Sequence, residues 1–311
     1  MDRIDWERIA ERVRNWGRWG AEDNRGTLNL IGPEALKRGF AAARDGKQFS
    51  LGLRFDRHGP QGEGLRTNPQ LIFHAIDTPI NPAFPFTRYA DDSVFMALQC
   101  ATQWDALSHV HYGGELYNGC KVCDTLTPTG ANRLGVEHLA NPGITARGIL
   151  LDVARHLAVD ELPAGHAITP DLLNAVVAAQ GVTIEPGDIV AIRTGAIRAM
   201  VLHGDRTRFA ASQPGLDATC AEWLFDQQAA AVCADNFAVE VLTAETMASD
   251  ICLPMHPLCL RDMGLPLGEM FNLEDIATDC AADRRYEFLL CAPPLGFTGA
   301  VGSPVNPIVL K

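Results

Sequence analysis

The segment GILLDV at residues 148–153 is a short apolar run of the kind that a buried β-strand shows. Similar runs recur along the chain with helical segments between them: strands at 187–195, 230–235, 286–292 and 305–309, and helices at 170–180 and 216–228. The first of these helices has a clear start signal, because Thr169 can cap it and Pro170 occupies its first position. Strands that alternate with helices predict an α/β fold, with a largely buried sheet flanked by helices.

The chain before residue 144 has a different pattern. An amphipathic helix is predicted at 6–16 and a second one at 33–44, where Pro33 suits the first helical position. Between 52 and 100, short β-like runs at 71–73 and 94–98 are separated by Gly, Pro and Asn, which suggests a β-rich layer. The sequence shows no internal repeat and no low-complexity segment. We therefore predict a single compact domain at 46–311 with an N-terminal helical extension at 1–45.

The composition argues against several classes of protein. The chain has 311 residues, of which 47% are hydrophobic and 21% charged, as in soluble globular proteins. A formal net charge of -12 disfavours binding to nucleic acid or to an anionic membrane. The sequence has no apolar stretch of about 18 residues and no signal-peptide run near its start, so we expect a cytoplasmic protein. Nine scattered cysteines predict reduced core thiols, and the CxxC of Cys120 and Cys123 lacks the second pair of a zinc ribbon.

The segment QCATQWDALSHVHY at 99–112 concentrates polar side chains that can carry chemistry. Four of them stand at odd-numbered positions and would share one face of a strand: Gln103, Asp105, His109 and His111. The segment at 106–108 between them can let the chain turn. Burying several such groups without mutual partners or a metal is costly, so their grouping points to a site. The structural alternative is that Asp105 caps a turn and the histidines are half-buried hydrogen-bonding residues.

A second polar cluster lies far along the chain, in DICLPMHPL at 250–258 and GLPLGEMFNL at 264–273. Metal sites often recruit ligands from distant segments, and His256 and Glu269 can converge on one point with the first cluster. The alternative for His256, which precedes Pro257, is a structural histidine at a turn.

The first polar segment resembles the signature H-x-G-T-H-x-D-x-x-x-H of the cyclase family, which includes bacterial kynurenine formamidases and isatin hydrolase. Thr102, Asp105 and His109 match this signature, while Gln99 and Gln103 stand where the family has histidines. The later cluster resembles the family pattern of a His followed by Gly-[Ile/Leu]-Pro-[Ile/Leu]-x-Glu. The segments 230–240 and 302–307 also resemble the family. The segments 19–23, 26–29 and 117–119 resemble a subgroup of longer cyclase-like proteins that carries QWD in place of HxD.

This resemblance implies a swivelling β/β/α fold, a divalent zinc or manganese ion, and hydrolysis of an amide, lactam or lactone by metal-bound water. A single metal would be held by Asp105, His109, His256 and Glu269. The catalytic residues implied are Gln103, Asp105, His109 and His256, with Gln103 as an adjacent ligand or a donor to the substrate. A glutamine oxygen is a weaker zinc ligand than imidazole, but manganese tolerates it.

The resemblance also implies a homo-oligomer, either a dimer or a tetramer. Trp6, Trp16 and Trp19 offer apolar surface that a partner subunit or the chain's own domain could cover.

Two other functions stay open from the sequence: a metal-free protein that binds a small ligand on the same scaffold, and a lyase or cyclase. His111 and His74 are further candidates for acid/base roles. Trp104, Tyr112 and Phe73 are candidate pocket walls, with plain core residues as the alternative.

Overall fold

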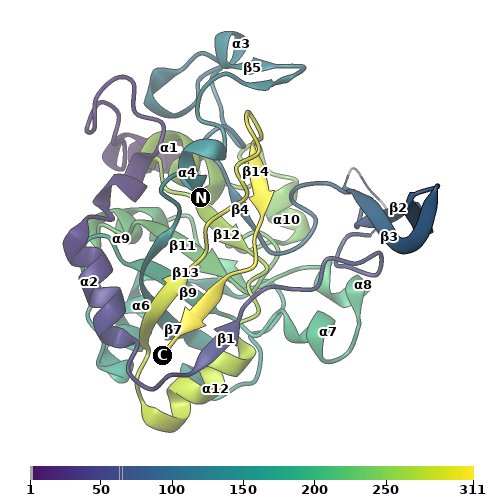
Figure 1. The fold of residues 1–311 in the computed structure, drawn as a ribbon. Coiled ribbons are helices and arrows are strands. Elements are labelled where there is room, and N and C mark those ends of the chain that lie inside the picture. The colour runs from purple at the N-terminus through teal and green to yellow at the C-terminus, as the bar shows by residue number, and fades with distance from the viewer. Residues whose placement is uncertain (1–2, 63, 65) are drawn as a thin grey trace.

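A nine-stranded mixed sheet forms the centre of the computed structural model, which describes residues 3–62, 64 and 66–311 (Figure 1). In order across the sheet, its strands are β1 (Gln48–Ser50), β15 (Ile308–Leu310), β13 (Glu287–Cys291), β7 (Thr145–Asp152), β9 (Ile189–Arg193), β11 (Ala231–Ala234), β12 (Leu267–Glu269), β4 (Gln103–Asp105) and β14 (Gly302–Pro304). The four strands β7, β9, β11 and β12 run parallel. The flanking pairs are antiparallel, so β4 lies between β12 and β14 in an antiparallel ladder.

The strands predicted at 148–153, 187–195, 230–235 and 286–292 are confirmed as β7, β9, β11 and β13. The strand predicted at 305–309 is wrong in its bounds. The chain instead forms β14 before this segment and β15 at its end. Pro304 and Pro307 have no backbone N–H to donate, which interrupts a continuous ladder here.

Side chains of the central strands alternate between two cores. Ile149 and Leu151 of β7 join the core that α6 (Pro170–Gln180) and α9 (Cys220–Asp226) cover. Leu150 points to the other core, which α12 (Glu274–Asp283) helps to close. The cap predicted for α6 is confirmed, since the Thr169 hydroxyl accepts a hydrogen bond from the N–H of Leu172 at 3.4 Å. The sheet is therefore buried on both faces, as its apolar runs predict.

The N-terminal helices α1 (Arg3–Arg12) and α2 (Pro33–Ala42) pack against the body of the chain. Helix α1 is shorter than the predicted 6–16, because the N–H of Asn15 bonds to the carbonyl of Asp262 instead of continuing the helix. The indole N–H groups of Trp6 and Trp16 donate to the carbonyls of Pro254 and Arg261 at 3.0 and 2.8 Å. The chain's own body thus buries Trp6 and partly covers Trp16.

A long hairpin replaces the β-rich layer predicted between 52 and 100. Strands β2 (Gln70–Asn81) and β3 (Phe84–Phe95) pair with each other and project from the body (Figure 1). We call residues 70–95 the hairpin arm. The β-like run predicted at 71–73 lies in β2, and the run at 94–98 begins in β3. The two strands form a projecting pair instead of a layer on the body, and Phe86 near the tip is 99% exposed. The arm exposes large apolar side chains along its length: Leu71, Ile72, Phe73, Ile76, Ile80, Phe84, Phe86, Tyr89, Val94 and Phe95.

Short elements connect the main ones: η1 (Gly26–Leu30), η2 (Tyr117–Gly119), α3 (Val122–Thr125), β5 (Leu126–Thr127), β6 (Gly130–Ala131), α4 (Glu137–Ala140), α5 (Val153–His156), β8 (Ala167–Ile168), α7 (Arg198–Val201), α8 (Arg206–Phe209), β10 (Gly215–Leu216), α10 (Ala244–Met247), α11 (Met255–Pro257) and the π-helical turn η3 (Leu258–Met263). All nine cysteines are free thiols, six of them buried. Among the described residues, no helix combines the length and the apolar content that a membrane crossing requires.

Gly26 lets the N-terminal segment approach the loop that leads to β12. Its φ is +56°, and a Cβ at this position would overlap the carbonyl oxygen of Gly264. We expect Gly26→Ala to lower the free energy of unfolding by about 3 kcal/mol, through both the unfavourable φ and the clash. Gly17→Ala is the matched control, because Gly17 has a φ of +76° with open space around it. Urea denaturation measures both, and equal losses would show that the clash is relieved without cost.

Candidate metal centre

Two adjacent strands place the first polar side chains of the site. Gln103 of β4 lies directly opposite Glu269 of β12 in the antiparallel ladder, so their side chains share one face. Asp105 is two residues along β4 and faces the same side. The Nε2 of Gln103 donates to Glu269 Oε2 at 2.5 Å and to Asp105 Oδ1 at 3.4 Å. The glutamine amide therefore bridges the two carboxylates.

His256 brings an imidazole to these carboxylates from α11. Its Nε2 lies 3.2 Å from Glu269 Oε1 and 3.7 Å from Asp105 Oδ2. The potential ligand atoms of Asp105, His256 and Glu269 all lie within 4.8 Å of one another, and all three residues are buried. The π-helical turn η3 follows His256 and leads the chain into β12, so it sets the position of both His256 and Glu269. The structure thus brings together the two segments that are far apart in the sequence.

Glu240 orients His256, and the sequence analysis missed it. Its Oε1 lies 2.5 Å from His256 Nδ1, and the same carboxylate accepts the backbone N–H groups of Met255 and His256 at 3.0 and 3.1 Å. A carboxylate that accepts from Nδ1–H leaves Nε2 directed at the other ligands, as in many metal sites. No spacing rule links Glu240 to a histidine sixteen positions later, so the sequence carries no signal for this contact.

Burial and neighbouring charges shift the pKa values of Asp105 and His256. Burial raises the pKa of Asp105 to about 6, against the charge interaction with His109. Burial alone would lower the pKa of His256, but hydrogen bonds to Glu240 and Glu269 raise it well above its ordinary value. Two buried oxygens, Asp105 Oδ2 and Gln103 Oε1, have no hydrogen-bond partner among the described residues. Carboxylate oxygens with one imidazole form a donor set that zinc or manganese accepts, so these residues fit a divalent ion.

His109 lies at the edge of this group. Strand β4 ends at Asp105, and the chain then turns, with the N–H of His109 bonded to the carbonyl of Ala106 at 3.0 Å. The prediction that one strand face carries both His109 and His111 is therefore wrong. His109 Nε2 still lies 3.8 Å from Asp105 Oδ1, and burial lowers its pKa. Its role as a fourth ligand stays a prediction, whereas His111 lines a different cavity, beside Trp6.

The remaining residues that the sequence analysis singled out lie elsewhere. Trp104 is fully buried and packs edge-on against Phe271, with its N–H on the carbonyl of Ala292. The Tyr112 ring stacks edge-on with Trp6, and its hydroxyl bonds to Asp262. Phe73 and His74 lie on the hairpin arm, where the His74 ring bonds to the Ser93 hydroxyl. The amide of Gln99 lies against Gly302. Trp104 and Tyr112 are thus structural residues rather than walls of the site.

A cavity of about 190 Å³ opens beside the candidate metal centre. Its polar lining consists of Arg66, His109, His256 and Glu269. The rest is mostly apolar: Val110, Phe237, Ala238, Leu242, Met247 and Leu253. Small-molecule sites have this composition, with a few polar groups in an apolar wall. We therefore take this cavity as the candidate substrate site.

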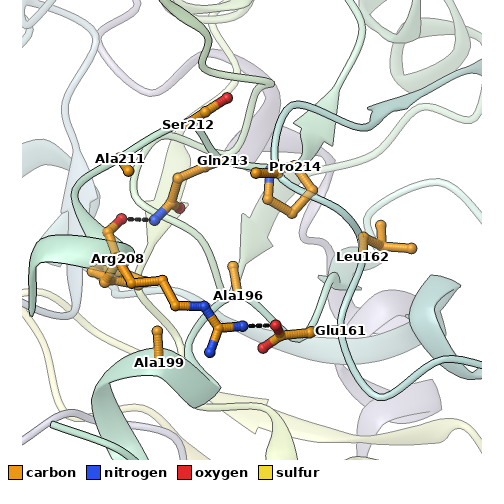
Figure 2. A pocket seen from close by; sticks show the side chains of 11 residues that line it. Glu161, Leu162, Ala196, Ala199, Arg208, Ala211, Ser212, Gln213 and Pro214 are labelled. Atoms are coloured by element: carbon orange, nitrogen blue, oxygen red, sulfur yellow. Dashed lines mark hydrogen bonds and ion pairs between the residues drawn. The ribbon is translucent and has the colours of Figure 1, made fainter. Parts of the chain in front are cut away.

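A second cavity, of about 150 Å³, lies near α7 and α8 and contains none of the predicted site residues (Figure 2). Its arginine, Arg208, forms an ion pair with Glu161 across the lining. The charge of this arginine is thus already compensated by a carboxylate of the same lining.

Comparison with known proteins identifies the family. The model of the Cyclase family matches residues 61–241. The chain belongs to the cyclase family. The solved structure of a novel cyclase is 37% identical and superposes with a TM-score of 0.88, over 97% of this chain and 99% of that one. This agreement confirms the predicted cyclase-like α/β fold.

More distant solved structures share the fold of this cyclase-family chain. Isatin hydrolase A from Ralstonia solanacearum is 17% identical, with a TM-score of 0.61 over 85% of this chain and 91% of that one. A predicted metal-dependent hydrolase from Bacillus stearothermophilus is 15% identical, with a TM-score of 0.50 over 85% and 97% of the two chains. No curated protein matches the sequence.

Removing the negative charge that orients His256 should weaken metal binding. We expect Glu240→Gln to lower zinc affinity about 10- to 100-fold, the usual effect of losing a carboxylate behind a histidine ligand. Titration calorimetry on chelator-treated protein measures this change. Glu222→Gln is the control, because Glu222 is on α9 and pairs with Arg8 at 3.2 Å. Unchanged zinc affinity in Glu240→Gln would show that Glu240 does not orient His256 for metal binding.

Proposed function

We propose that this chain is a metal-dependent hydrolase that acts on a small amide, lactam or lactone. One observation carries the proposal: the buried group of Asp105, His256 and Glu269 adjoins a small and mostly apolar cavity, and Asp105 Oδ2 makes no hydrogen bond to any described residue. The names of two proteins with the same fold, an isatin hydrolase and a predicted metal-dependent hydrolase, support this class of reaction.

In this proposal Asp105, His256 and Glu269 hold a zinc or manganese ion, with His109 at the edge of the group. When bound, such an ion polarises a carbonyl and lowers the pKa of a water molecule. Glu240 keeps the Nδ1 of His256 engaged, so that Nε2 stays directed at the site. His109 faces both the cavity and Asp105, a position from which its Nε2 can accept a proton from the attacking water.

Gln103 has two parts in the same arrangement. Its N–H groups hold the carboxylates of Asp105 and Glu269 in place. Its Oε1 is buried and unpartnered among the described residues, so it is available as an oxygen ligand or as an acceptor for a substrate N–H. The catalytic set is thus Gln103, Asp105, His109 and His256.

Metal analysis together with a substrate panel tests the proposal. Protein purified without chelator should carry close to one divalent ion per chain. It should hydrolyse at least one compound from a panel of lactones, lactams and formamides, and zinc or manganese should restore this activity after chelation. Protein without metal that turns over no member of the panel, with either ion added, would contradict the proposal.

A metal-free protein that binds a small ligand is the second candidate function. The observation in its favour is the amide of Gln103, whose N–H groups already satisfy part of the charge of the two carboxylates. This candidate predicts ligand binding that chelator leaves unchanged. Lyase or cyclase chemistry is a further outcome of the same panel. Turnover in isotopically labelled water distinguishes it, because hydrolysis places an oxygen from water in the product and lyase or cyclase chemistry does not.

We also propose that the chain is a homo-oligomer in which a second copy covers the hairpin arm. A lone two-stranded hairpin has no core of its own, and this one exposes ten large apolar side chains. An arm that projects from the body is covered by another chain more readily than by its own. Closed homo-oligomers such as dimers and tetramers are the commonest assemblies, so a second copy is the partner that fits.

Replacing three apolar residues of the hairpin arm should break up this assembly. We expect Ile76→Ser, Phe84→Ser and Phe86→Ser together to reduce the mass in light scattering to that of one chain. Phe40→Ser on α2 is the control, since Phe40 is an exposed apolar residue outside the arm. A wild-type protein that is monomeric across micromolar concentrations would refute the oligomer.

A further inference from the structure

Arg66 brings a positive charge to the wall of the candidate substrate cavity. Its side chain is half-buried, Nη1 donates to the carbonyl of Gln99 at 3.3 Å, and Nη2 lies 3.5 Å from His109 Nε2. Within the described part of the chain, no carboxylate forms an ion pair with it. The contrast with Arg208 is clear, because that arginine lines the other cavity and is paired with Glu161 (Figure 2).

The unpaired guanidinium has unused donor capacity. An arginine offers five N–H donors in a planar fork, whereas Arg66 makes two long contacts to described residues, Gln99 and His109. The fork matches a carboxylate, which it binds through two parallel hydrogen bonds. The other side chains of the cavity wall are acidic, imidazole or apolar, so Arg66 carries the permanent positive charge that an anionic ligand would meet in this lining.

The position of Arg66 places such an anion next to the reacting centre. Arg66 Nη2 lies 3.5 Å from His109 Nε2, which in turn lies 3.8 Å from Asp105 Oδ1. One imidazole therefore separates the guanidinium from the candidate metal centre. A cavity of about 190 Å³ is small for a ligand site, which typically spans about 300 to 1,000 Å³, so it suits a compact molecule.

We propose that Arg66 binds a carboxylate of the substrate, so that the substrate class is a compact amide, lactam or lactone with a carboxylate close to the scissile carbonyl. This inference rests on the proposed hydrolase function. In the reaction, the oxygen of water bonds to the carbonyl carbon, and the C–N or C–O bond breaks. The electron pair of that bond leaves with the nitrogen or oxygen, which takes a proton from the water. Arg66 takes no part in these bond changes and acts by holding the substrate.

Binding of benzoate and of its neutral counterpart benzamide tests the proposal without turnover. We expect wild-type protein to bind benzoate more tightly than benzamide in titration calorimetry, and Arg66→Gln to weaken benzoate binding about 100-fold. Benzamide binding should change little, and Arg66→Lys should restore part of the difference. Arg208→Gln is the matched control, because it removes an arginine from the other cavity. Equal loss for both probes, or no loss of benzoate binding in Arg66→Gln, would overturn the proposal.

Kinetics separate this proposal from the proposed function. With 2-formamidobenzoate and its methyl ester as probes, Arg66→Gln should raise KM for the carboxylate about 100-fold, with kcat nearly unchanged and the ester unaffected. A fall of kcat for both probes would mean that Arg66 acts on the reacting carbonyl, which overturns the assignment. Benzoate binding that depends on Arg66 in a protein without hydrolytic activity would refute the hydrolase and leave the carboxylate site standing.

Discussion

Asp105→Asn should reduce hydrolysis by at least about 10³-fold and release the metal ion. Asp105 supplies an anionic oxygen from the strand segment of the site, and its Oδ2 is buried without a hydrogen-bond partner among the described residues. Metal catalysis stabilises a transition state by several kcal/mol, and each 1.36 kcal/mol is tenfold in rate, so losing the ion costs about three powers of ten. Atomic spectrometry and steady-state kinetics measure the two effects. His256→Ala and Glu269→Ala should have the same result.

The control for this prediction is Asp226→Asn, since Asp226 is an exposed carboxylate that pairs with Arg12 at 2.6 Å. Thermal denaturation of the metal-free proteins separates loss of the site from loss of the fold. Full metal occupancy in the His256→Ala and Glu269→Ala variants would refute the ligand assignment.

Gln103→His should raise zinc affinity by about 100-fold and impair hydrolysis. The amide of Gln103 lies between Asp105 and Glu269, so an imidazole at this position adds a nitrogen donor beside both carboxylates. Zinc prefers imidazole to a neutral amide oxygen. Removing a residue that supports one metal ligand changes metal affinity about 10- to 100-fold, so a gained ligand should have an effect at the upper end of this range. The new ligand also occupies the coordination position that a water needs and removes the Gln103 oxygen that substrate would use.

Zinc titration by calorimetry measures this second prediction, and Gln213→His is its control. Gln213 is likewise buried but lines the other cavity, so a histidine there should leave zinc affinity unchanged. Unchanged zinc affinity together with retained activity in Gln103→His would show that Gln103 does not face the site.

Local signals account for what could be predicted of the fold. The apolar runs of β7, β9 and β11 and the cap at Thr169 depend on residues that are neighbours in the chain, so the sequence carries them directly. The hairpin arm was not predicted, because its apolar residues lie on two exposed faces and give no sign of the layer that would normally cover them. A turn at 106–108 was allowed for and is found after Asp105, but its effect on His111 was not predicted, because alternation of polar residues does not show how a chain continues beyond a turn.

Residues that are close in the chain were enough to predict the α/β class, the buried sheet and the two segments from which the site is built. Only the tertiary structure decided which side chains meet there. The register of β4 against β12 sets Gln103 opposite Glu269, and the folded loops bring Glu240 to His256 and Arg66 to His109. These contacts join residues 16 to 166 positions apart. Residue spacing does not encode such distances, because they depend on how whole elements pack around the cores of the sheet.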